Sequence, residues 1–229
     1  MKRFYKSVTV GEIDAGFGIA LDGKPLTTPG RVTLALPTRA LAEAIAEEWR
    51  GQAEEVVPGP LTRLANTAAE RTPHRRGETA AQILEFGKSD LLCYRAEGPD
   101  ELVARQGRGW NPLLDWARER HGAALSVTAG IGFVEQPAEA LLALERAVWA
   151  HDDFALTALH AAAALAGSLV LALALVDGRL IAAEAYVLAR IDETFQAEKW
   201  GVDAEAAARA AYQLAELEAA ERFLRLSRP

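Results

Sequence analysis

The hydrophobic pattern changes along the chain from strand-like alternation to helical spacing, and this change constrains the fold more than any other feature. In the first 40 residues, short strand-like segments are separated by glycine-rich turns and by Asp22-Gly23, a hairpin signal. We expect strands over 7–10, 17–21 and 32–36. After Thr38, which suits a helix N-cap, Leu41, Ile45 and Trp49 recur every four residues and predict a helix over 40–52.

Beyond this helix the spacing of apolar residues is almost entirely helical. We expect helices over 61–69, 77–86, 100–108, 110–120, 137–149, 154–176, 181–199 and 204–226. The shift near residue 90 is the best available domain boundary. The sequence therefore predicts an α+β protein, with a small β-rich N-terminal domain over 1–90 and an all-α multihelical C-terminal domain over 91–229.

Residues 154–176 contain no Asp, Glu, Lys or Arg, and about 20 apolar residues can cross a bilayer. However, alanine is frequent in this stretch, Gly167-Ser168 interrupts it, and no aromatic belt flanks it. We expect two buried helical segments, 154–166 and 168–176, stopped by Asp177-Gly178. A membrane-associated protein is the alternative, and it would need detergent during purification.

The charge and cysteine content exclude several classes of protein. A net charge of -7 and a pI near 5.2 would repel phosphate backbones, so we expect no nucleic-acid partner. A single cysteine, Cys93, cannot form an intramolecular disulfide or a cysteine metal cluster, and we expect it to be an inert core thiol. Polar residues from Thr9 to Asp14 interrupt any signal-peptide core, so secretion by that route is not indicated.

The sequence offers few candidates for catalysis. The histidines lack the spacing of a zinc helix, and they are His74, His121, His151 and His160. Asp153, in the cluster His151-Asp152-Asp153, is expected to cap a helix. Gly16-Phe17-Gly18 lacks the third glycine of a dinucleotide loop, and Gly167-Ser168 suits packing or capping better than a nucleophile elbow. We expect no metal and no cofactor.

The small number of candidate catalytic residues favours a binding protein over an enzyme, because enzymes usually gather several polar groups in one pocket. The alternative is a small hydrolase or ligand-binding enzyme with an inter-domain site around His151, Asp152 and Glu193.

The segment 189–201 has the pattern of a docking helix. Ile191 and Phe195 lie four residues apart on one face, whereas Asp192, Gln196 and Lys199 follow helical spacing on another. The segment ends with Trp200 beside Gly201, where an aromatic side chain is often accessible. Such a helix can pack inward and present polar groups outward.

Together with this segment, four motifs resemble the ATP12 family of F1-ATPase assembly chaperones nearly from end to end. The motifs are Arg3-Phe4-Tyr5-Lys6, Leu21-Asp22-Gly23-Lys24-Pro25-Leu26-Thr27-Thr28-Pro29, Glu48-Trp49-Arg50-Gly51-Gln52 and Asp90-Leu91-Leu92-Cys93-Tyr94-Arg95. The resemblance implies a non-catalytic chaperone that binds the unassembled α subunit of the F1 sector of ATP synthase and shields its aggregation-prone interface. It implies no cofactor, and a free monomer whose interface is reserved for the α subunit.

The first family motif begins at Arg3, without the presequence of mitochondrial members. We therefore expect a bacterial cytoplasmic protein, with eukaryotic relatives in the mitochondrial matrix.

By the same resemblance, partner contact is assigned to Asp192, Glu193, Gln196, Glu198 and Trp200. Glu193 is the first choice, since a carboxylate on a helix face can pair with an Arg or Lys of the client. The other matched residues are expected to fix turns or the join between strand and helix, and they are Gly23, Pro25, Pro29, Glu48 and Gln52. Asn111 is expected to cap a helix that starts at Pro112. Three tryptophans on apolar helical faces are expected to be structural: Trp49, Trp116 and Trp149.

Overall fold

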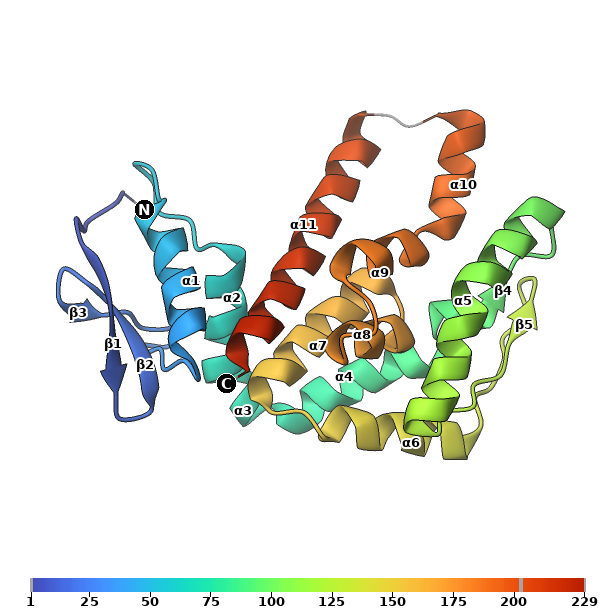
Figure 1. The fold of residues 1–229 in the computed structure, drawn as a ribbon, viewed down its shortest axis with the longest axis horizontal. Helices are drawn as coiled ribbons and strands as arrows, with labels where there is room; N and C mark the ends of the chain where they lie inside the picture. The colour runs from blue at the N-terminus through green and yellow to red at the C-terminus, as the bar shows by residue number, and fades with distance from the viewer. Residues whose placement is uncertain (1, 202–203, 229) are drawn as a thin grey trace. The chain divides into compact units, whose positions relative to one another are not determined.

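The computed structural model describes residues 2–201 and 204–228 (Figure 1). The chain divides into two compact units, each assembled from separate segments. The first contains Met1–Arg76, Asp152–Ala158 and Ala219–Pro229, and the second contains Gly77–His151 and Leu159–Glu218. The expected division into domains over 1–90 and 91–229 stays a prediction.

The first unit contains an antiparallel sheet of three strands in the order β1-β2-β3. The strands are β1 (Val8–Ile13), β2 (Gly16–Leu21) and β3 (Lys24–Pro25). The predicted hairpin at Asp22-Gly23 is confirmed, because both residues have positive φ, 48° and 79°, and join β2 to β3. The expected strand over 32–36 is wrong. This segment makes only isolated bridges, Thr27 to Thr33 and Phe17 to Leu36.

Helix α1 (Arg39–Arg50) lies across one face of this sheet, as Figure 1 shows. It begins as predicted at Thr38, whose hydroxyl accepts the Leu41 N–H at 3.1 Å. Leu41, Ile45 and Trp49 are all buried, so the four-residue spacing does define the core face. After α1 come α2 (Pro60–Asn66), a π-helical turn (Thr67–Arg71) and α3 (Thr72–His74).

Glu48 and Gln52 fix the connection between α1 and α2. The Glu48 carboxylate accepts the N–H groups of Leu61 at 2.8 Å and Thr62 at 2.9 Å, which are exposed donors at the start of α2. The Gln52 side-chain amide bonds both the N–H and the carbonyl of Val57. These two family-motif residues therefore have the structural role expected of them.

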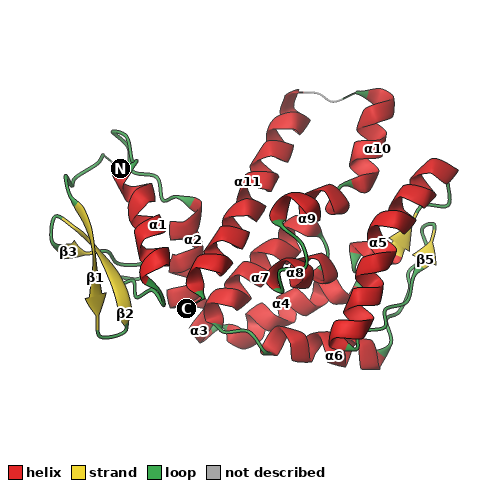
Figure 2. Cartoon of the chain, viewed as in Figure 1, coloured by secondary structure: helices red, strands yellow, loops and turns green. Residues whose placement is uncertain are grey.

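The second unit is helical apart from a parallel pair of very short strands, β4 (Tyr94–Arg95) and β5 (Thr128–Ala129) (Figure 2). The remaining elements of the chain are α4 (Arg76–Lys88), a 3-10 turn (Leu91–Cys93), α5 (Asp100–His121), α6 (Ala138–Trp149), α7 (Asp153–Ala166), α8 (Leu169–Val176), α9 (Ala182–Ala189), α10 (Ile191–Trp200) and α11 (Ala204–Ser227). The first part of α7 and the last part of α11 belong to the first unit. The prediction of an α+β fold with a small N-terminal sheet and a multihelical remainder is confirmed.

The uncharged stretch forms two helices, α7 and α8, as predicted. Gly167 takes a left-handed conformation at φ 64°, and the Ser168 hydroxyl accepts the Leu171 N–H at 3.0 Å to begin α8. Every side chain of α8 is buried. Among the described helices, none is long and apolar enough to cross a membrane.

Two local predictions are corrected by the structure. Helix α5 continues through Pro112, so Asn111 does not begin a helix. Because Pro112 has no N–H, α5 lacks the helical hydrogen bond to the Arg108 carbonyl. Arg108 lies on the exposed side of α5. The cap of α7 is Asp152, whose carboxylate accepts the Ala155 N–H at 2.8 Å, and not Asp153, which pairs with Arg76.

The tryptophan predictions are right in part. Trp49 is buried, and Trp116 is half-buried with its ring edge-on to His121 at 5.0 Å. Trp149 is 42% exposed, so its assignment to the core is wrong. It is the last residue of α6, where the apolar face of the helix ends. Cys93 is fully buried as expected, and burial raises the pKa of its thiol to about 12.

Candidate partner-binding site

The segment predicted as one helix over 181–199 is broken at Arg190, and this break sets the direction of α10. Arg190 has φ -119° and ψ 25°, outside the helical range, so α9 ends and α10 begins around it. The indole N–H of Trp110 donates to the Leu188 carbonyl at 2.8 Å. That carbonyl lies in the last turn of α9, where helical partners are missing, so Trp110 stabilises the end of this helix.

Helix α5 also approaches this break closely through Gly109. A methyl group at Gly109 would lie 2.8 Å from Cδ1 of Ile191 and 2.9 Å from Cδ2 of Leu188. Side chains from both sides of the break therefore pack directly on the backbone of α5. The start of α10 is held by a glycine and a tryptophan that are adjacent in α5.

Two of the five predicted contact residues bond to α5. The Asp192 carboxylate accepts from Gln106 Nε2 at 2.6 Å, and the buried Gln106 in turn accepts the Ala96 N–H at 2.9 Å. Glu198 accepts two bonds from the Arg105 guanidinium, at 2.8 and 3.0 Å. These bonds lower the pKa of Glu198 below its usual value. Both carboxylates have partners within the chain.

The other three predicted residues, Glu193, Gln196 and Trp200, are exposed and share one face of α10. Their spacing of three and then four residues brings them onto one side of the helix. Trp200 is 80% exposed, which is unusual for so large an apolar side chain. All three line a pocket of about 510 Å³, and Ala206 and Ala210 of α11 contribute part of its opposite wall.

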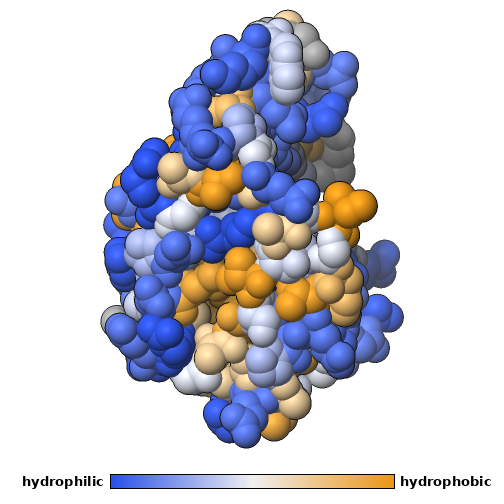
Figure 3. All heavy atoms as spheres, turned by 90° about the vertical axis from the view of Figure 1, so that its right-hand side faces the viewer, coloured by the Kyte–Doolittle hydropathy of each residue, from blue (hydrophilic) through white to orange (hydrophobic). Residues whose placement is uncertain are grey.

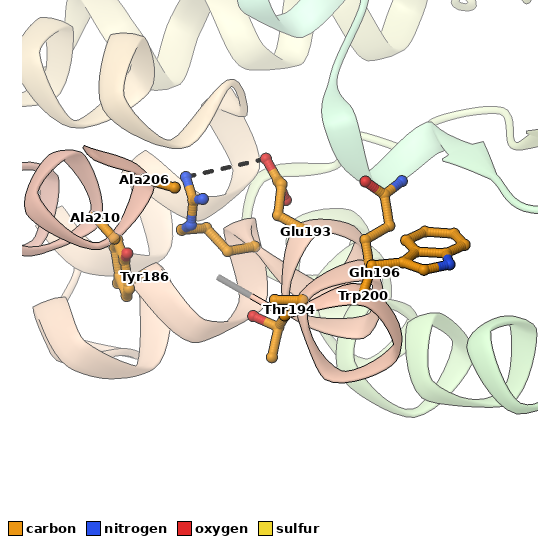
Figure 4. A pocket seen from close by; sticks show the side chains of 10 residues that line it. Tyr186, Glu193, Thr194, Gln196, Trp200, Ala206 and Ala210 are labelled. Carbon is orange, nitrogen blue, oxygen red and sulfur yellow. Dashed lines mark ion pairs between the residues drawn. The ribbon is translucent and has the colours of Figure 1, made fainter. Parts of the chain in front are cut away.

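Figure 4 shows how these side chains lie. A dashed line marks the ion pair of the Glu193 carboxylate, while Gln196 and Trp200 extend from α10 on the side away from Tyr186 and Ala210. The ion pair between Glu193 and Arg190 is long, at 4.0 Å between the charged atoms. Arg190 makes a shorter bond of 2.8 Å to the Gln213 side chain. Among the residues that the structure describes, Glu193 therefore has one weak ion-pair partner.

The side chains that line the pocket are of mixed chemistry. It combines small alanine side chains, two aromatic rings, a carboxylate and an arginine, and it contains no histidine or cysteine. His151 and Asp152, proposed with Glu193 for the alternative enzyme site, are not part of this lining, and Asp152 caps α7. Across the described ranges, no group of three or more His, Cys, Asp and Glu side chains could hold a metal ion.

The α5 residues that position this site, Gln106, Gly109 and Trp110, were not predicted to have a part in it. All three lie within the six residues before Pro112, where the sequence indicates only a helix start. A glutamine and a tryptophan four residues apart on the inner face of a helix were the available signal, because a buried amide must find partners. Nothing in the sequence pointed to Leu188 or Asp192 as those partners.

Comparison with known proteins gives consistent matches. A family model described as ATP12 chaperone protein matches residues 2–118. The chain is 24% identical over 214 residues to mitochondrial protein atp12 of Schizosaccharomyces pombe, covering 87% of this chain and 74% of the relative. The crystal structure of Atp12 from Paracoccus denitrificans superimposes with a TM-score of 0.94 at 47% identity, covering 99% of this chain and 98% of that one. A chaperone candidate from Agrobacterium tumefaciens superimposes with a TM-score of 0.93 at 44% identity, covering 98% and 85%.

Proposed function

The chain belongs to the ATP12 chaperone family, and from that membership we propose that it assists assembly of the F1 sector of ATP synthase. Its client in this proposal is the unassembled α subunit, whose aggregation-prone interface it covers until assembly. It acts as a binding protein without a cofactor or a catalytic step, and it is monomeric when free. Since two of its structural relatives are bacterial, the bacterial cytoplasm is the proposed location.

The observation that carries this proposal is the exposed face of α10. A chaperone needs apolar surface that it can offer to a client, with charges that orient the client and keep the complex reversible. Trp200 supplies a large exposed ring, the adjoining pocket includes small alanine side chains in its lining, and Glu193 supplies a charge with one weak partner among the described residues. Aromatic anchors of this kind carry much of the binding energy in protein interfaces.

We assign client contact first to Glu193, Gln196 and Trp200. A client Arg or Lys would pair with Glu193 more closely than Arg190 does at 4.0 Å. We also assign Asp192 and Glu198 to this client surface, because their bonds to Gln106 and Arg105 hold α10 in place. Their contribution to binding would then act through the position of the helix.

The variant Glu193→Lys tests this assignment. Reversing an exposed charge should change the free energy of unfolding by less than about 1 kcal/mol, because exposed ion pairs contribute little. Binding to purified α subunit should weaken by about tenfold or more, since a lysine would face the client's own cation. Titration of α subunit followed by tryptophan fluorescence measures the affinity, and urea unfolding measures the stability.

Glu47→Lys is the matched control. Glu47 is also exposed, lies on a helix and pairs with an arginine three residues away, Arg50, but it lies in the first unit, outside the α10 surface. This control should bind α subunit as the unsubstituted chain does. If Glu193→Lys binds normally, the assignment of Glu193 is wrong, and if it unfolds the chain, the residue is structural.

A further inference from the structure

A second surface of the helical unit exposes apolar side chains, in the segment between α5 and α6. We call residues 126–136 the apolar loop. Its two ends are held together by the buried Gln136, whose side-chain amide accepts the Ser126 N–H at 2.8 Å and donates to the Ser126 carbonyl at 3.0 Å. Within the loop, β5 pairs with β4, and the Gly130 N–H donates to the Arg95 carbonyl at 2.9 Å. The loop is therefore anchored at its ends and along one strand.

This anchored loop carries apolar side chains that are exposed and do not contribute to the core. Ile131 is fully exposed, Phe133 is 75% exposed and Val127 is 47% exposed. Scattered single apolar residues on a surface are ordinary, but three within seven residues of an anchored loop form a patch. On the face of the molecule seen from the side of α5 and β5, apolar side chains gather in a hollowed band with polar groups around it (Figure 3).

A groove continues this patch onto α5. Its volume is about 310 Å³, and its apolar lining includes Leu114 of α5 together with Leu125 and Val127. Val127 belongs to both the apolar loop and the groove, so the two surfaces are continuous. The polar side of the groove contains Asp115 and Arg118, which pair with each other at 2.8 Å.

Two exposed carboxylates lie in the loop or against it. Glu97 lies against Gly130, where an added methyl group would be 2.9 to 3.1 Å from the Glu97 carboxyl group. Glu135 is exposed within the loop itself. Neither carboxylate forms an ion pair with any residue that the structure describes. An anionic lipid surface would be repelled here, whereas a polypeptide with Lys or Arg beside its apolar residues would be attracted.

We propose that the apolar loop and its groove form a second contact surface for the client polypeptide, which receives an apolar segment flanked by Lys or Arg. The apolar side chains of that segment would cover Ile131 and Phe133 and enter the groove beside Leu114, and its cations would pair with Glu97 and Glu135. This proposal rests on the proposed function, since it requires that the client is an unassembled protein subunit.

The double variant Ile131→Ser with Phe133→Ser tests the apolar part. Because both side chains are exposed, the circular dichroism spectrum and the thermal midpoint should stay as in the unsubstituted chain. Affinity for purified F1 α subunit should fall by about tenfold or more, as expected on removing two interface anchors. Val57→Ser, which removes an exposed apolar side chain from the first unit, is the matched control and should bind normally.

The double variant Glu97→Lys with Glu135→Lys tests the proposed pairing of these carboxylates with client cations. It should weaken binding and make it less sensitive to salt.

Normal binding by the Ile131/Phe133 variant, alongside normal binding by the unsubstituted chain, overturns this proposal alone. If the unsubstituted chain itself fails to bind α subunit, the proposed function fails and this proposal fails with it. Loop-dependent sedimentation with phosphatidylglycerol vesicles would identify a membrane contact instead and would also overturn it.

Discussion

At the scale of single residues, Asp90 shows how one family-motif side chain organises the helical core. Its carboxylate is fully buried and accepts from the Ser168 hydroxyl at 2.7 Å, the Val170 N–H at 2.9 Å and the Leu92 N–H at 3.0 Å. It thereby joins the 3-10 turn to the start of α8. Burial raises its pKa to about 6, although these hydrogen bonds oppose the shift.

This raised pKa predicts a pH dependence of stability. The folded chain holds the Asp90 proton up to about pH 6, whereas the unfolded chain loses it near pH 3.8, so the contribution of Asp90 to stability falls as pH rises between these values. The shift corresponds to about 3 kcal/mol, at about 1.4 kcal/mol per pKa unit. Urea unfolding of the unsubstituted chain and Asp90→Asn at pH 4 to 7 measures it.

The stability of the unsubstituted chain relative to Asp90→Asn should fall by about 2 kcal/mol over that range, because part of the full change lies below pH 4. The asparagine places an amide against the Val170 N–H, but that cost does not change with pH and leaves the slope unaffected. Cys93, whose thiol pKa is about 12, does not titrate in this window. A stability difference that is constant, or that rises with pH, would contradict the assignment.

At the scale of elements, the direction of α10 is determined by α5 more than by its own sequence. Trp110 bonds the end of α9, Gly109 lets the break at Arg190 pack closely, and Gln106 bonds Asp192 at the start of α10. The exposed residues Glu193, Gln196 and Trp200 keep their place only while these contacts hold. The proposed client surface is therefore supported from α5 below it.

Trp110→Phe is predicted to loosen this support. The ring keeps most of its packing, but the Leu188 carbonyl loses its donor, which should cost about 1–2 kcal/mol of stability. Hydrogen exchange of the amides in α10 should become faster, because the helix is held less firmly. Trp116→Phe, on the same helix but without this bond, should leave exchange in α10 unchanged. Equal exchange in α10 for both variants would show that Trp110 does not position it.

Sequence reasoning predicted the elements that have local signals. The helix after Thr38, the hairpin at Asp22-Gly23 and the division of α7 from α8 at Gly167 all follow from capping residues and glycines. The break at Arg190 has no such signal, because Ala189-Arg190-Ile191 contains neither glycine nor proline and the helical spacing continues across it.

In the candidate site, too, the features that depend on local spacing could be predicted and the distant contacts could not. Spacing alone brings Glu193, Gln196 and Trp200 onto one face of α10. The partners of Asp192 and Glu198, which are Gln106 and Arg105, lie 86 and 93 residues away, so no local pattern could reveal them. Whether an acidic residue is free or bonded depends on such tertiary contacts.

At the scale of the whole molecule, the N-terminal unit is completed by segments from much later in the chain. The Thr38 hydroxyl donates to the Leu226 carbonyl, Thr72 bonds Thr157 at 2.7 Å, and Phe154 stacks on Phe223 at 5.7 Å. The unit therefore cannot gain its full set of contacts until the end of α11 has been synthesised. Contacts of such high sequence separation are a reason why the composition shift near residue 90 could not reveal how the units are assembled.

The central claim is that this chain keeps an unassembled F1 α subunit soluble by binding it. The most direct measurement is to express the α subunit from the same source with and without this chain, and to follow soluble α subunit and its co-purification. We predict that soluble α subunit increases only in the presence of the chain and purifies with it in a stoichiometric complex. An α subunit whose solubility is unchanged, and which does not bind the chain, would contradict this account.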